Sequence, residues 1–258
     1  MRVCNLSSGS DGNLTYIESE NAKILVDIGL SCKETETRLN LLKVNPQSID
    51  AILISHEHSD HIKGMEAFAQ KYKTKIYVHK DGVFSLSRKI KKPLNIVAYD
   101  DDFKVGDLDV HSIMVPHDVE RCSAYAISEN EKKVSIITDL GHTTPEIIKN
   151  ISGSSLVFIE ANHDIETLLA NPNYPAVLKQ RILSKKGHLS NKDSASAILE
   201  LVKTGTRQIV LSHLSRENNS PNLAFTYISD WLEQNGVIQG QNVKIDVADI
   251  VPKAIFRL

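Results

Sequence analysis

The chain has 258 residues, of which 41% are hydrophobic and 24% are charged, and its formal net charge is −2 at pH 7. This composition is typical of a globular protein with a substantial core, and its charge does not indicate the strongly basic surface of many nucleic-acid-binding domains. Because no stretch approaches the roughly 18 apolar residues of a membrane span and no linker or signal-like start is visible, we expect one cytoplasmic domain over residues 1–258.

Short strands begin the chain. The sequence predicts strands at 3–6 and 14–17, joined by a loop of glycines and small polar residues that ends at Asn13, and a third strand at 24–29. Asp27 lies inside the apolar run of the third strand, where an unpaired charge is costly, so it either has a partner or caps the strand end. An amphipathic helix is expected over 33–44, before a strand at 51–55.

The most informative motif follows that strand. His56, His58, Asp60 and His61 form an H-x-H-x-D-H pattern of metal-ligating residue types. In an extended loop, His56 and His58 point to one side while Asp60 and His61 turn to the other, so the pattern predicts ligands for two ions. The alternative is a solvated polar loop.

The middle of the chain continues to alternate between helix and strand. We expect a helix over 62–72 and strands at 76–78, 110–115, 124–127 and 134–141. Residues 71–92 are rich in lysine and arginine, which either contact phosphates or form a solvated face balanced by the aspartates within 100–109. His117 and Asp139 each lie at the end of a strand, where a β-scaffold presents functional side chains.

The last third repeats the pattern of strands that end in polar residues. A strand at 156–159 leads to Glu160 and His163, which either support a site or merely end the strand, and a strand at 208–212 leads to His213. His188 lies beside two lysines, before a helix that Ser190 is expected to cap, which is a setting that favours phosphate; a loop histidine without a role is the alternative. Further helices are expected over 174–183 and 221–235, with an edge strand at 243–247.

These motifs resemble those of the metallo-β-lactamase-fold hydrolases, whose signature matches residues 56–61. Within that superfamily the chain is most similar to the bacterial YycJ/WalJ group, through segments 6–13, 160–164, 187–191 and 212–215. The resemblance implies an α/β fold of the four-layer αβ/βα sandwich type, with two mixed β-sheets flanked by helices and a metal site at one edge.

The resemblance also implies a role for individual residues. Two divalent ions are expected, the first on His56, His58 and His117, the second on Asp60, His61 and His213, with Asp139 bridging both. Zn, Mn and Fe all accept such ligands. The expected catalytic residues are Asp60, Asp139 and His188; the expected substrate contacts are Asn13, His188 and Asn191; and the expected supports behind the ligands are Asp27, Glu160 and His163.

The resemblance implies phosphodiester hydrolysis as the activity. Histidine at position 58 argues against the oxygen-reducing di-iron relatives, and Asp139 argues against the antibiotic-hydrolysing ones, which carry Cys or Ser there. We therefore expect a 5′-to-3′ exonuclease whose partner is double-stranded DNA, with no membrane partner. A small-molecule hydrolase such as a thioesterase or cyclic phosphodiesterase, an RNA-processing nuclease and a regulatory binding module are the alternatives, and the sequence leaves the oligomeric state open.

Overall fold

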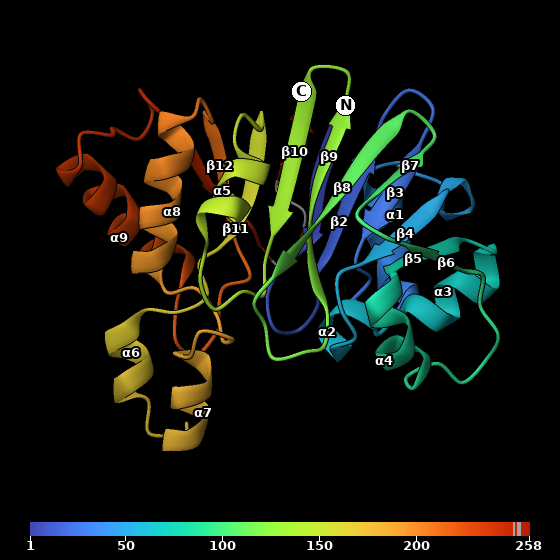
Figure 1. The fold of residues 1–258 in the computed structure, drawn as a ribbon, viewed down its shortest axis with the longest axis horizontal. Helices are drawn as coiled ribbons and strands as arrows, with labels where there is room; N and C mark the ends of the chain where they lie inside the picture. Colours follow the sequence, from blue (N-terminus) through green and yellow to red (C-terminus); the bar gives the residue numbers. More distant parts are fainter. Residues whose placement is uncertain (250, 252–253) are drawn as a thin grey trace.

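The computed structural model describes residues 1–249, 251 and 254–258, and its strands form two seven-stranded sheets packed face to face (Figure 1). The first sheet has the order β14 (Phe256–Arg257), β1 (Arg2–Ser7), β2 (Leu14–Glu18), β3 (Lys23–Val26), β4 (Ala51–Ile54), β5 (Lys75–His79), β6 (Ile96–Tyr99). The second has the order β13 (Lys244–Val247), β12 (Gln208–Ser212), β11 (Leu156–Glu160), β10 (Lys132–Ile137), β9 (Cys122–Glu129), β8 (Leu108–Val115), β7 (Asp102–Val105).

Both sheets are mixed in the same way. Strands β14, β1, β2 and β3 pair antiparallel and β3 to β6 pair parallel. In the second sheet, β7 to β10 pair antiparallel and β10 to β13 pair parallel. The prediction of two mixed sheets is therefore confirmed.

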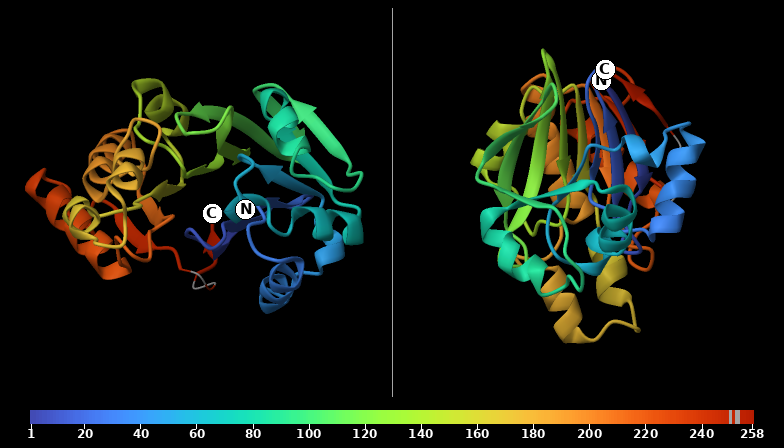
Figure 2. Two further views of the ribbon diagram at one scale, coloured as in Figure 1. Left: turned by 90° about the horizontal axis from the view of Figure 1, so that it is seen from below. Right: turned by 90° about the vertical axis from the view of Figure 1, so that its right-hand side faces the viewer.

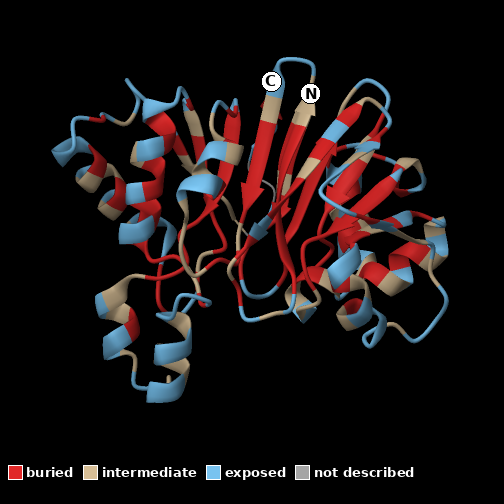
Figure 3. Ribbon diagram, in the orientation of Figure 1, coloured by how far each residue is buried: buried red, intermediate tan, exposed pale blue. Residues whose placement is uncertain are grey.

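Helices cover the outer face of each sheet (Figure 2). On the first sheet lie α1 (Cys32–Leu41), α3 (Met65–Tyr72) and α4 (Val83–Ser87); on the second lie α5 (Pro145–Ile151), α8 (Asn191–Lys203) and α9 (Pro221–Gln234). Three buried apolar clusters fill the interfaces between these four layers, so the strands are largely buried and the helices expose only their outer sides (Figure 3). Within the described residues, no helix is long and apolar enough to span a membrane.

One end of the sandwich collects the carboxyl ends of strands from both sheets. Among them are β3 and β4 of the first sheet and β8, β10, β11 and β12 of the second. The short helices α2 (Ser59–Ile62), α6 (Ile165–Ala170) and α7 (Ala176–Ile182) lie at this end, whereas both termini lie at the opposite end (Figure 1). Loops that leave these strands can therefore bring side chains from both sheets together.

Several predicted elements differ from the structure. The predicted helix over 62–72 is two helices, because the Gly64 N–H donates to the Ile28 carbonyl at 2.9 Å in place of a hydrogen bond within a helix. The strand expected over 24–29 ends at Val26, since Asp27 is left-handed with φ 57°. The sequence reasoning missed β6, β7, β14 and α4, whereas the predicted edge strand is present as β13.

Candidate metal centre

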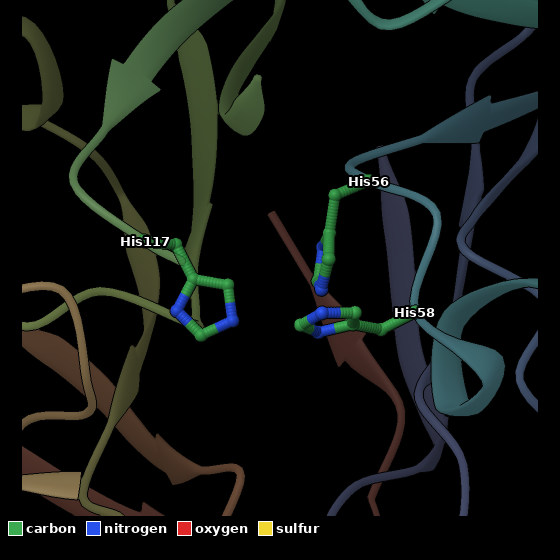
Figure 4. Close-up of side chains that lie close together, drawn as sticks. All are labelled: His56, His58 and His117. Atoms are coloured by element: carbon green, nitrogen blue, oxygen red, sulfur yellow. The ribbon is translucent and has the colours of Figure 1, made fainter. Parts of the chain in front are cut away.

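Three histidines from both sheets face one another at this end of the sandwich (Figure 4). His56 and His58 come from the loop after β4, and His117 comes from the loop after β8. Their ring centroids are 4.6 Å (His56 to His58), 5.2 Å (His56 to His117) and 5.2 Å (His58 to His117) apart. One ring nitrogen from each lies within 4.8 Å of the others, so the three can share one ion.

A second set of ligand types, Asp60, His61 and His213, lies beside the first. His61 and His213 each place Nε2 near Asp60 Oδ2, at 3.4 Å and 3.6 Å. Asp60 and His61 belong to the short helix α2 and not to an extended loop, so the predicted local geometry was wrong. The helical turn nevertheless brings Asp60 beside His213 of the loop after β12, while the His61 ring lies 4.2 Å from that of His56.

Asp139 lies between the two sets. Its Oδ2 is 3.1 Å from His61 Nε2, and its Oδ1 is 3.5 Å from His213 Nδ1 and 3.9 Å from His117 Nε2. The residue is left-handed, with φ 59°, which turns the chain sharply after β10. Burial acts to raise the pKa of this carboxyl, but the rings of His213 and His61 outweigh it and hold the pKa well below its usual value.

Unpaired buried atoms test whether these residues fit a metal. Among the described residues, His56 Nε2, His117 Nε2, His213 Nε2 and Asp139 Oδ2 are buried and have no hydrogen-bond partner. A buried polar atom left unsatisfied costs about 1–3 kcal/mol, and four of them converge here. Imidazole and carboxylate are also the donor types that divalent transition metals accept. The residues therefore fit a site for divalent metal ions.

Asp27 fixes one of these ligands from behind. Its Oδ2 accepts a hydrogen bond from His61 Nδ1 at 2.8 Å, and its Oδ1 accepts one from the backbone N–H of Ser55 at 2.9 Å. Because Nδ1 carries the proton, the lone pair of His61 is on Nε2, which faces Asp139. The partner that the sequence required for Asp27 is therefore a histidine of the candidate centre and the start of the motif loop.

Glu160 supports the other side of the centre. Its Oε1 accepts hydrogen bonds from His213 Nδ1 at 2.7 Å and from His188 Nδ1 at 2.9 Å, and its Oε2 accepts the N–H groups of Leu140 and Leu189. Burial acts to raise the pKa of Glu160, but His188 and His213 outweigh it and hold the pKa at about 2. One ionised carboxylate therefore sets the orientation of two histidine rings.

His188 lies beside the centre with one ring nitrogen available. Its side chain is 21% exposed, its Nδ1 is 3.7 Å from Asp139 Oδ1, and its ring lies 5.2 Å from that of His117. Asp139, Glu160, His188 and His213 also have the spacing of a metal-binding group. Because Glu160 already accepts hydrogen bonds from Nδ1 of both rings, we interpret it as a residue that orients the two histidines and not as a metal ligand. His188 Nε2 makes no hydrogen bond to any residue that the structure describes.

Two other predicted site residues do not face the centre. The Asn191 side chain is 1% exposed and pairs with Asn219 in both directions, at 3.3 Å and 2.8 Å, which does not support the predicted substrate contact. His163 is equally buried, and within the described chain its ring nitrogens contact no ligand, which does not support the role expected for it. Asn13, in contrast, places Nδ2 3.0 Å from His61 Nε2 and 3.4 Å from Asp60 Oδ2.

Sequence reasoning missed Asp118, which directly follows His117. Its Oδ1 lies 3.2 Å from His117 Nε2 and 3.9 Å from His58 Nε2, and its Oδ2 is bound by Arg181 of α7. A carboxylate next to a strand-end histidine is a signal that the sequence contained. The ion pair also ties α7 to the loop that carries His117.

Gly29 sets the position of the motif loop against the loop before β2, and Gly29→Ala is expected to destabilise the protein by about 3 kcal/mol or more. A Cβ atom there would lie 1.7 Å from the Asp60 carbonyl oxygen and 2.6 Å from the Asn13 nitrogen. Chemical denaturation measures the effect. Gly82→Ala, whose Cβ would meet its nearest neighbour at an ordinary 3.4 Å, is the control, and equal stability of the two variants would contradict this packing.

The comparisons with known proteins agree with this architecture. A family model described as "Beta-lactamase superfamily domain" matches residues 22–214. The chain is 36% identical over 248 residues to the exodeoxyribonuclease YycJ of Bacillus anthracis, covering 95% of this chain and 94% of that protein. It is also 36% identical over 246 residues to the exodeoxyribonuclease WalJ of Streptococcus pneumoniae serotype 2, covering 93% and 91%.

Solved structures show the same fold. The metallo-beta-lactamase fold protein YhfI from Bacillus subtilis is 15% identical with a TM-score of 0.74, and the match covers 99% of both chains. Zn²⁺-bound PqqB from Methylobacterium extorquens is 15% identical with a TM-score of 0.76 over 100% of both chains. The predicted fold class, a metallo-β-lactamase-type sandwich, is confirmed.

Proposed function

Because this chain belongs to the β-lactamase superfamily, in one family with the YycJ and WalJ exodeoxyribonucleases, we propose that it is a metal-dependent exonuclease that hydrolyses DNA. The observation that carries the proposal is the meeting of two ligand sets at Asp139, with His188 beside them. Such a paired arrangement suits attack on a phosphodiester, in which both the entering and the leaving oxygen need stabilisation.

Two divalent ions would be held by these residues. His56, His58 and His117 provide the first set of ligands, Asp60, His61 and His213 provide the second, and Asp139 joins them. When bound, such a pair supplies Lewis-acid stabilisation of the phosphodiester and a nucleophile from water near neutral pH. Zn, Mn and Fe all suit imidazole and carboxylate ligands. Elemental analysis of the purified protein would identify the native ion.

The chain's own side chains position the reacting groups. Asp60 and Asp139 accept hydrogen bonds and so orient the attacking water. In its doubly protonated form, His188 donates its Nδ1–H to Glu160 and can give its Nε2 proton to the leaving oxygen. The oxygen of the attacking water bonds to phosphorus while the P–O bond to the leaving oxygen breaks, and the leaving oxygen takes the Nε2 proton of His188.

The substrate is bound through its backbone and not through its base sequence. Unpaired cations flank the centre locally, among them Lys185 and Lys186 next to His188, although the net charge of the whole chain is −2. Contacts of this kind bind phosphates through counterion release and carry no sequence information. We therefore propose double-stranded DNA as the substrate and digestion from its 5′ end.

A comparison of linear, nicked and covalently closed circular DNA tests the proposal. With Mn²⁺, we expect loss of the linear form and persistence of the closed circle, with no cleavage in the presence of a chelator. Release of label from the 5′ end before the 3′ end would set the direction. Rapid hydrolysis of a thioester or a cyclic phosphodiester without any DNA cleavage would contradict the proposal, as would cleavage of RNA alone.

A further inference from the structure

The outer side of α4 carries an aromatic ring that the metal chemistry does not use. Phe84 is 67% exposed, while Leu86, two residues later on the opposite side of the helix, is buried. In the described part of the chain, Phe84 is the only aromatic residue among the large hydrophobic side chains that are exposed. An exposed ring of this size offers a large flat apolar face for contact with another ring.

The position of α4 is fixed relative to the candidate centre. Gly82 and Leu86 line one small cavity together with His56 and Glu57, so the buried side of α4 packs on the motif loop. The hydroxyl of Ser85 donates a hydrogen bond to Glu120 Oε2 at 2.9 Å, and Glu120 is on the loop that follows His117. Figure 1 shows α4 at the same end of the sandwich as α2, which carries Asp60 and His61.

Cations that form no ion pair with any described residue follow the ring along the chain. The Arg88 guanidinium lies over the Phe84 ring, 6.0 Å from its centroid. Within the described residues, Arg88, Lys89, Lys91 and Lys92 form no ion pair, whereas Lys71 and Lys80 of the same basic segment pair with Glu36 and Asp100. The acidic residues within 100–109 therefore do not neutralise the part of the segment next to Phe84.

We infer that Phe84 is a stacking platform for a base of the DNA strand that is bound across the metal centre, with the cations of 88–92 meeting its phosphates. This inference rests on the proposed function. A nucleic-acid strand repeats an apolar base face and an anionic phosphate, and an exposed ring beside unpaired cations complements both. Stacking accepts every base, so the platform adds affinity without sequence preference.

Phe84→Ala is expected to raise the KM for DNA about ten- to a hundredfold with little change in kcat, because one stacked base is lost. Phe84→Trp, which keeps a stacking face, is expected to restore the KM. Leu41→Ala is the matched control, since Leu41 is 66% exposed on α1 and should leave the KM unchanged. Metal content and the hydrolysis of bis(p-nitrophenyl) phosphate, a diester without a base, are measured on each variant.

The outcomes separate this inference from the proposed function. A wild-type KM in Phe84→Ala, in a protein that digests DNA, would overturn the platform and leave the exonuclease proposal intact. Equal losses of DNA cleavage and of diester hydrolysis, or failure of Phe84→Trp to recover, would also overturn it, because they indicate a structural role. A wild-type protein that does not cleave DNA would contradict both the stacking platform and the exonuclease proposal.

Discussion

Replacing His188 with alanine is expected to lower kcat on DNA by about 10²–10⁴-fold while the protein keeps its metal ions, since this is the usual contribution of a proton donor. The geometry explains why the rate should fall while the metal content is kept. His188 Nδ1 donates to Glu160 at 2.9 Å, and its Nε2 forms no hydrogen bond with a described residue, so the ring is oriented with one nitrogen left for a substrate. The six histidine and aspartate ligands together with Asp139 remain in place without it.

The measurement pairs single-turnover kinetics with elemental analysis. His142→Ala is the control, because His142 lies near the same turn, its Nδ1 donates to the Lys185 carbonyl at 3.0 Å, and it has no proposed role. We expect that control to keep both its rate and its metal. A His188→Ala protein that loses metal would make His188 a ligand, and one that keeps nearly full rate would remove it from the mechanism.

The position of the ligands was predictable because each follows a strand. His56, His117 and His213 come directly after apolar runs, and strands of one sheet bring their ends to a common edge. The H-x-H-x-D-H spacing then identified the chemistry. A single sequence shows less well which residues hydrogen-bond to these histidines. Asp27 bonds to His61 and Glu160 bonds to His213, and both partners are distant along the chain.

Contacts between residues distant in the sequence also explain where the predictions and the structure differ. Asn191 is next to the expected cap of α8, and only the packing of that helix shows that its amide turns inward to Asn219. The break at Gly64 comes from its hydrogen bond to the Ile28 carbonyl, which is distant in sequence. Local propensity does not include such contacts, and tertiary packing overrides it.

Asp139→Ala is expected to lose more metal than any single change behind the ligands, with an affinity loss of more than about 100-fold. Removal of a supporting partner typically costs 10–100-fold in metal affinity, and Asp139 is proposed as a ligand shared by both sets. Its oxygens lie 3.1 Å from His61 Nε2 and 3.9 Å from His117 Nε2. We expect the wild type to hold close to two ions and Asp139→Ala to hold fewer than one.

Asn13→Ala is the comparison variant, because Asn13 is also next to His61 and Asp60 but offers an amide in place of a charge. It should retain most of the metal. Thermal unfolding with and without chelator gives a second readout: metal that binds only the folded state raises Tm, so the chelator should lower Tm in the wild type and have little effect on Asp139→Ala. Equal metal content in the wild type and Asp139→Ala would remove Asp139 from the centre, and the two ligand sets would then have to act as separate sites.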